Sequence, residues 1–170
     1  APVSPLPVYA TGAGGLAYQL NYVSGGGGAA FTDLGDTLFM TGTDALRQGA
    51  WLFAIDPSSG AQLARVPVEN STYADVVIDP AQPWLYVGAI QHCAVSVHVF
   101  DRRTLELVAT LRAPADAAPH DYPACTYQWD YVLVLDGAQR HLYVTINVTF
   151  SGVGYRPTPA SHVVVFDLMP

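Results

Sequence analysis

The chain has 170 residues, of which 51% are hydrophobic and 12% charged, and its formal net charge is −7. Typical soluble domains carry roughly 25% charged residues, and disordered chains carry more charge and fewer apolar residues, so a domain with a core is expected. The 14 acidic residues face 7 basic ones, all arginine, which excludes the basic surface of a nucleic-acid-binding protein. The absence of lysine also excludes Schiff-base chemistry and the lysine of a P-loop.

Three features together indicate a secreted, extracellular or periplasmic protein. The first residues, "APVSPLP", suit a mature N-terminus left after cleavage behind a small residue. Two glycosylation sequons begin at Asn70 and Asn147, which makes these residues candidate glycan sites. The content of charged residues is low. No apolar run approaches the ~20 residues of a membrane helix, so no membrane span is expected.

The first predicted strand is "LAYQLNYV", residues 16–23, in which large apolar and smaller or polar residues alternate. The glycine-rich stretch "SGGGGA" (24–29) follows it. Because no "GK[ST]" comes after these glycines, they are interpreted as a flexible connection and not as a phosphate-binding loop. Residues 1–28 are therefore expected to form an N-terminal segment that contains an outer strand without a sheet of its own.

An internal repeat organises the rest of the chain. The segments "VVIDPAQPWLYV" (76–87) and "LVLDGAQRHLYV" (133–144) lie 57 residues apart and share seven of twelve residues. A weaker copy is "AAFTDLGDTLFM" (29–40). Each copy predicts a short strand, a turn at Asp, and a second strand that carries Leu-Tyr or Leu-Phe.

A third strand ending in Asp follows in each copy, at Asp56, Asp101 and Asp167. A fourth apolar strand comes next in the first two copies, at 61–68 and 105–113, but not in the third. The Asp carboxylates are expected to accept backbone N–H groups two residues further on and so close tight turns. Ligand binding by these Asp residues is the less frequent alternative.

Four short antiparallel strands in each unit are typical of β-propeller blades. Here the units recur at intervals of 45 and 66 residues, counted from Asp56 to Asp101 and from Asp101 to Asp167. The chain resembles the YVTN-type, quinoprotein-dehydrogenase-like propeller repeats over about residues 29–168. The residues that carry this resemblance are Asp79-Pro80, Leu85-Tyr86-Val87, Val99-Phe100-Asp101 and Thr104-Leu105.

The resemblance implies an all-β fold of three propeller blades, at about 29–68, 75–113 and 130–168. Propellers of this type have six to eight blades in one chain, so three blades are a departure from the pattern. A β-sandwich of about twelve strands is the alternative, although it does not explain the repeat.

A third blade with three strands would leave an unpaired strand edge. We therefore expect residues 16–23 to pair, as an outer strand, with residues 161–167 of another copy of the chain, which gives a dimer or a filament. The alternative is that the remaining blades belong to another part of a longer protein. The expected partners are thus further copies of this chain or further propeller blades.

The propeller resemblance also predicts one face where loops gather. Loops between second and third strands share this face with the links between blades, so Cys93 and Cys125 should lie close enough for a disulfide. Closing the 32-residue separation (125 − 93) would stabilise the fold by roughly 3–4 kcal/mol. Two buried free thiols are the alternative. The same face is the candidate ligand-binding face and contains His92, His120, Asp121 and Tyr122.

His and Asp side chains can bind a metal or act as acid and base, but adjacent residues on a strand point in opposite directions. Packing of a loop histidine is therefore the more frequent role for His120. Asp75 and Asp130 lie near the starts of innermost strands, where some propeller hydrolases hold a metal such as Ca or Zn. Turn capping is the alternative for both carboxylates.

No HExxH, GxSxG or CxxC motif occurs in the chain. The sequence therefore predicts a secreted propeller module for structural assembly, or for recognition of a ligand or protein, without a cofactor. The alternatives are a propeller enzyme, namely a metal-dependent hydrolase, or a non-catalytic subunit of an oxidoreductase complex.

Overall fold

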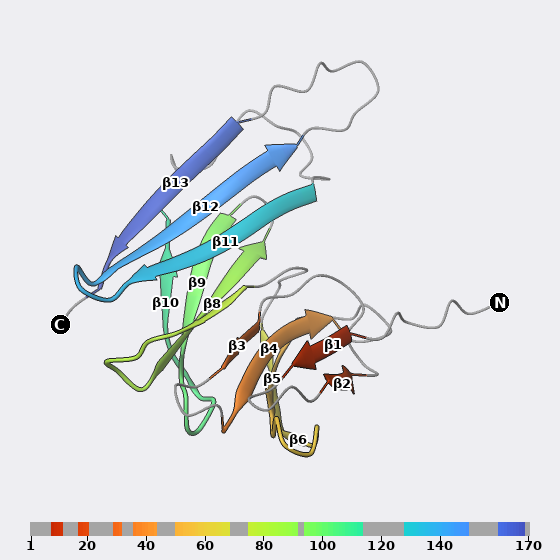
Figure 1. The fold of residues 1–170 in the computed structure, drawn as a ribbon. Coiled ribbons are helices and arrows are strands. Elements are labelled where there is room, and N and C mark those ends of the chain that lie inside the picture. The colour runs from red at the N-terminus through yellow and green to blue at the C-terminus, as the bar shows by residue number, and fades with distance from the viewer. Residues whose placement is uncertain are drawn as a thin grey trace.

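A computed structural model describes the backbone of residues 8–11, 17–20, 29–31, 36–43, 50–68, 75–91, 94–113, 128–149 and 160–168. The regular secondary structure of these residues consists of antiparallel β-strands in four sheets (Figure 1). The predicted all-β class is therefore confirmed. Among the described residues, no helix is long and apolar enough to cross a membrane.

Three sheets contain most of the strands, and neighbours within each sheet follow chain order. The first sheet contains β3 (Ala29–Phe31), β4 (Leu38–Thr43), β5 (Ala50–Ile55) and β6 (Gln62–Val68). The second sheet contains β7 (Val76–Ile78), β8 (Trp84–Gln91), β9 (Ala94–Asp101) and β10 (Leu107–Arg112). The third sheet contains β11 (Gln128–Asp136), β12 (His141–Thr149) and β13 (Ala160–Asp167).

The sequence predicts that the N-terminal strand has no partner within its own chain, but the structure shows one. Strand β2 (Ala17–Leu20) pairs with β1 (Val8–Thr11) of the same chain, in a separate two-stranded sheet. Pairing with a neighbouring segment satisfies one edge of the strand and closes only a short loop, so it costs little entropy. The prediction that residues 16–23 pair with 161–167 of another copy, and not within their own chain, is therefore wrong for this structure.

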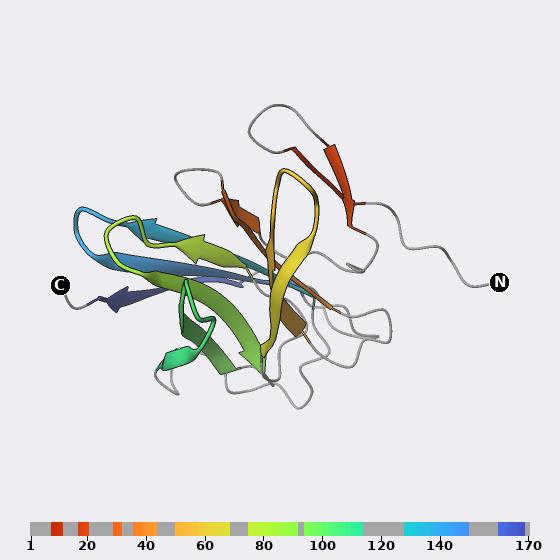
Figure 2. The same ribbon diagram turned by 90° about the horizontal axis from the view of Figure 1, so that it is seen from below.

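The second sheet lies between the other two. Its first strand, β7, is adjacent to the first strands of both neighbours, β3 and β11. Figures 1 and 2 show the first and third sheets on opposite sides of the second. Both faces of the second sheet are therefore covered, which differs from the single core of a two-sheet sandwich. In the described part of the chain each sheet is open, and none closes into a barrel.

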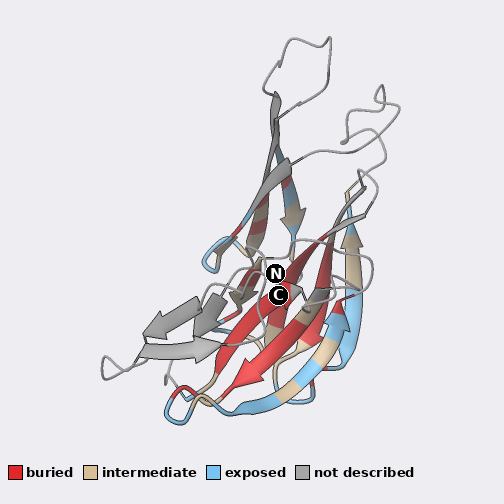
Figure 3. Cartoon of the chain, turned by 90° about the vertical axis from the view of Figure 1, so that its right-hand side faces the viewer, coloured by how far each residue is buried: buried red, intermediate tan, exposed pale blue. Residues whose placement is uncertain are grey.

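Two apolar clusters hold the three sheets together. Between the first and second sheets, Leu52 packs with Leu85. Between the second and third sheets, Val97 packs with Leu142 and Val144. Figure 3 shows buried residues concentrated in the middle of the molecule, with exposed residues along outer strands and turns. Burying one such side chain contributes on the order of 1.5–3 kcal/mol, so these clusters are the main source of the fold's stability.

Asp56, Asp101 and Asp136, which end strands or begin turns, close these turns as predicted, whereas the residues that follow Leu168 lie outside the described part of the chain, so the turn role of Asp167 stays a prediction. Asp56 accepts the N–H of Ser58 at 2.7 Å, and Asp101 accepts the N–H of Arg103 at 2.8 Å. At the end of β11, Asp136 accepts the N–H groups of two turn residues, both at 3.0 Å. These bonds satisfy backbone donors that the strand ladders leave unpaired.

The residue four positions after each of these Asp residues has a left-handed backbone. The φ angles are 71° for Gly60 and 57° for both Leu105 and Arg140. Glycine adopts this conformation without strain, whereas leucine and arginine do not. The turn thus requires the same backbone conformation in each case, although the residue at this position is glycine, leucine or arginine.

The Asp56 turn predicts a specific dependence of stability on pH. The Ser58 hydroxyl and then the Ser59 hydroxyl donate to the carboxylate and lower the pKa of Asp56 from 3.8 to about 2. The folded state thus binds this proton less readily than the unfolded state, so the contribution of the turn is complete above pH 3.8 and is lost as the pH falls towards 2. We expect Asp56→Asn to be less stable than the wild type at pH 5, with a difference that shrinks on acidification. Urea unfolding at several pH values measures this difference, and a pH-independent difference would contradict the assignment.

Candidate functional site

The outer face of the third sheet is the candidate functional site. Residues directly opposite each other on paired strands share one face of a sheet. Val132 pairs with Thr145, which pairs with Val163. The next row, along the same strands, is Val134, Tyr143 and Val165. We call the surface formed by Val132, Val134, Val163 and Val165 the valine face.

The valine face is open to solvent. The four valines are 45%, 53%, 60% and 48% exposed, in chain order. Val132 and Val134 lie on β11, which is adjacent to β7, so their exposure comes from an uncovered face and not from an outer strand position. The opposite face, with Leu133, packs against the second sheet. An exposed group of valines on one sheet face, with Thr145 and Tyr143 between them, is typical of an interaction site.

Strand β13 adds an open edge to the valine face. It pairs with β12 on one side, and no described strand pairs with it on the other. The sequence predicts three strands in this unit, and these three are the strands that the structure describes. In the second sheet, the corresponding position beside β9 is occupied by β10. The edge of β13 can therefore accept another strand through backbone hydrogen bonds.

One end of the valine face is polar. The third row contains Asp136, His141 and Asp167. His141 Nε2 lies 3.1 Å from Asp167 Oδ1, and its ring packs edge-on against Tyr143, with 6.0 Å between centroids. Among the described residues, the hydrogen bonds that Asp136 accepts all go to its Oδ1. This end of the face thus presents two carboxylates beside an apolar surface.

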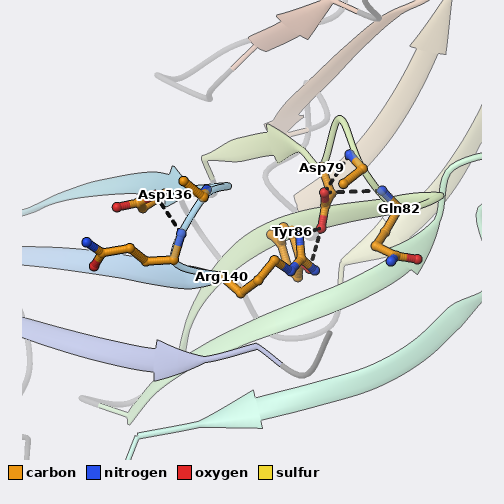
Figure 4. Close-up of polar contacts among 8 residues, drawn as sticks. Asp79, Gln82, Tyr86, Asp136 and Arg140 are labelled. Carbon is orange, nitrogen blue, oxygen red and sulfur yellow. Dashed lines mark hydrogen bonds and ion pairs between the residues drawn. The ribbon is translucent and has the colours of Figure 1, made fainter.

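A buried ion pair joins the second and third sheets (Figure 4). The Asp79 carboxylate, which is completely buried, accepts the N–H groups of Ala81 and Gln82 at 2.9 and 3.2 Å. It also accepts the Tyr86 hydroxyl at 3.0 Å and Arg140 Nη1 at 2.7 Å. Arg140 belongs to the third sheet and reaches back from the turn before β12. The pair therefore fixes the position of one sheet relative to the other.

The protonation states of this network follow from burial and charge. Burial, reinforced by the Asp79 carboxylate, raises the pKa of the Tyr86 hydroxyl to about 12, so it stays a donor. The hydrogen bond to Asp79 raises the pKa of Arg140 above its usual value. Sequence reasoning missed this pair, although Asp79 and Tyr86 recur as Asp136 and Tyr143 in the repeat.

Asp75, a candidate metal ligand in the sequence, makes structural hydrogen bonds. Its Oδ1 accepts its neighbour's N–H, and its Oδ2 accepts the N–H of Leu133 on β11 at 3.0 Å. The second bond again connects the second and third sheets. Of Asp130 the structure describes the backbone, which pairs with Asn147. Among the described residues, no three His, Cys, Asp or Glu side chains form a group that could hold a metal ion.

The other predicted site residues cannot be placed. The candidate ligand face (His92, His120, Asp121 and Tyr122) lies outside the described residues, as do Cys93, Cys125 and Asn70. The disulfide is not shown and stays a prediction. Asn147 lies in the central strand β12, where its backbone pairs with Asp130 and Ser161, and its use as a glycan site also stays a prediction.

A pocket lies between β6 of the first sheet and β9 and β10 of the second. It is lined by apolar residues and by His98, whose Nδ1 is 3.0 Å from the Thr110 hydroxyl. His98 is buried and is the one titratable side chain among the lining residues. The pocket therefore does not combine an acid, a base and a nucleophile, and the valine face remains the stronger candidate site.

Comparison with known proteins adds no family assignment. No protein-family model matches this chain, and no curated protein matches it. The candidate function therefore depends on the repeat and on the geometry of the sheets.

Proposed function

We propose that the chain is a β-propeller-type module for structural assembly or protein recognition, and that it acts through its third sheet. The propeller arrangement is supported by the strand order, which runs from first to last strand in each sheet. It is also supported by the adjacency of β7 to both β3 and β11, because blades of a propeller place their first strands around a common axis. The low charge and the sequons favour a secreted or periplasmic location.

The observation that carries this proposal is the combination of the exposed valine face with the edge of β13 that no described strand pairs with. Each feature alone favours association with another β-sheet protein. Together they offer a partner both backbone hydrogen bonds and an apolar surface. A recognition role of this kind needs no catalytic group and no cofactor.

The proposal predicts that the chain associates through the valine face when no other partner is present. We expect sedimentation velocity to show association that increases with protein concentration. The double variant Val163→Lys/Val165→Lys should abolish it, because two ammonium groups would have to be desolvated in the contact. Both side chains are exposed, so the variant should keep the stability of the wild type.

Leu63→Lys is the matched control. Leu63 lies on β6 of the first sheet and is therefore not part of the valine face, which belongs to the third sheet. It is 58% exposed, which is close to the exposure of Val163. We expect this variant to associate like the wild type. A wild type that stays monomeric at every concentration, or equal effects of the control and the valine variant, would refute the proposed surface.

A further inference from the structure

The repeat makes the second and third sheets comparable residue by residue. An offset of 57 residues relates β7 and β8 to β11 and β12, and an offset of 66 relates the end of β9 to the end of β13, as Asp101 and Asp167 show. Val97 and Val99 therefore correspond to Val163 and Val165. The face of the second sheet that contains Val97 and Val99 is the one that the third sheet covers.

The corresponding valines differ strongly in exposure. Val97 and Val99 are 0% and 7% exposed, whereas Val163 and Val165 are 60% and 48% exposed. The equivalent valines are thus covered by the third sheet in one case and exposed to solvent in the other. The contact between the second and third sheets therefore indicates what fits on the valine face, namely another sheet of the same type.

The aspartates at the polar ends of the Val97/Val99 face and of the valine face also indicate a covering sheet of the same type. Asp79 and Asp136 are equivalent, and each accepts two backbone N–H groups in its turn through Oδ1. Asp79 Oδ2 also binds Arg140, which the covering sheet supplies, at 2.7 Å. No bond to Asp136 Oδ2 is found among the described residues. Charge complementarity therefore calls for an arginine from a covering sheet at this point as well.

A second copy of the chain can meet the valine face with its own exposed valine face, but it does not offer the face that covers Val97 and Val99. That face is the one with Leu142 in the third sheet, and it already packs against the second sheet. Its counterpart in the second sheet, with Leu85, packs against the first. In the first sheet the counterpart contains Leu38 and Ile55, which are also buried. Each described sheet of a second copy thus has this face occupied.

We propose that the valine face is the docking surface for a further sheet of the same repeat, which contributes an arginine to Asp136 from the turn before its second strand. This inference rests on the proposed function, since it names the partner of the same surface. The arginine position is the one that Arg140 holds in the third sheet and that Pro83 holds in the second. The expected partner is therefore a sheet that has an arginine, as the third sheet does, and not a proline at this turn position, together with an apolar face.

A chain extended by its own repeat tests this inference. Asp167 is joined directly to a second copy of residues 102–168, because Asp167 corresponds to Asp101 and residue 102 continues the pattern. The extension supplies a copy of β10 for the edge of β13, and then a complete copy of the third sheet with its own arginine. Lysine replaces valine at 163 and 165 of the appended copy, so that the new outer face does not associate.

We expect the appended sheet to cover the valine face. Two variants test the contact, Asp136→Asn in the original part of the chain and Arg140→Met in the appended copy. Their combined effect on the unfolding equilibrium constant should differ from the product of the single effects by about tenfold or more, as it does for close charge pairs at interfaces. Val134→Lys should lower the melting temperature of the extended chain but leave that of the original chain nearly unchanged. Leu63→Lys, the control, should affect both chains equally little.

Three results would overturn the inference. The first is an appended sheet that stays unfolded, as judged by hydrogen exchange. The second is a folded extension without coupling between Asp136 and the appended arginine. The third is a tight dimer of the original chain that Val134→Lys breaks and Asp136→Asn does not affect, since a second copy would then be the occupant. In this third case the proposed association surface stands, so the two proposals fail separately.

Discussion

Replacing Asp79 by alanine is expected to lower the free energy of unfolding by about 3–5 kcal/mol, because it leaves the Arg140 guanidinium without its buried partner. The carboxylate is completely buried and also accepts the Tyr86 hydroxyl and two backbone N–H groups. Urea unfolding followed by circular dichroism measures the loss. Arg140→Met keeps the left-handed turn and most of the side-chain length, so it tests the charge alone.

Asp136→Ala is the matched control for Asp79→Ala. Both residues accept the N–H groups two and three residues further on, but Asp136 has no described arginine partner. The control should therefore cost about 1 kcal/mol, the usual net contribution of turn hydrogen bonds. The double variant of Asp79 and Arg140 should be less destabilised than the sum of the single variants. Equal losses for Asp79→Ala and Asp136→Ala would show that the ion pair adds nothing to the turn.

The comparison of these two aspartates shows what sequence reasoning could predict and what it could not. The repeat predicted the strands of the three sheets and the turn-closing role of Asp79 and Asp136, because both depend on local backbone chemistry. The burial of Asp79 depends on the packing of the next sheet, which brings Arg140 to it across 61 residues. A difference between Pro83 and Arg140 at equivalent positions was the available signal.

The valine face could not be predicted from the sequence either. In "HVVVFD" three valines follow one another, so no alternation indicates which of them faces the core. The structure buries Val164 and exposes Val163 and Val165. Strand β1 was missed because four residues between prolines and glycines give too short a pattern. In both cases tertiary pairing, and not local propensity, decides the outcome.

Leu142→Ala is expected to destabilise the chain by about 2–5 kcal/mol, because it removes a fully buried side chain from the cluster between the second and third sheets. Leu85 is its repeat equivalent and is also fully buried, but it lies between the first and second sheets. Leu85→Ala should therefore cost a similar amount. Val134→Ala, on the exposed valine face, should change the free energy of unfolding by less than about 0.5 kcal/mol, and the same chemical denaturation measures all three.

The pair Leu85 and Leu142 also tests how far the three sheets fold as one unit. Sheets that stack in sequence contact only their neighbours, so the loss of one interface should be felt first by the sheets that share it. Leu142→Ala should thus speed hydrogen exchange most in β11 to β13, and Leu85→Ala most in β4 to β6. Because the second sheet contributes to both clusters, it should be the last to exchange in either variant. Uniform acceleration across all three sheets in both variants would instead show a single cooperative unit, in which an uncovered valine face weakens the whole fold.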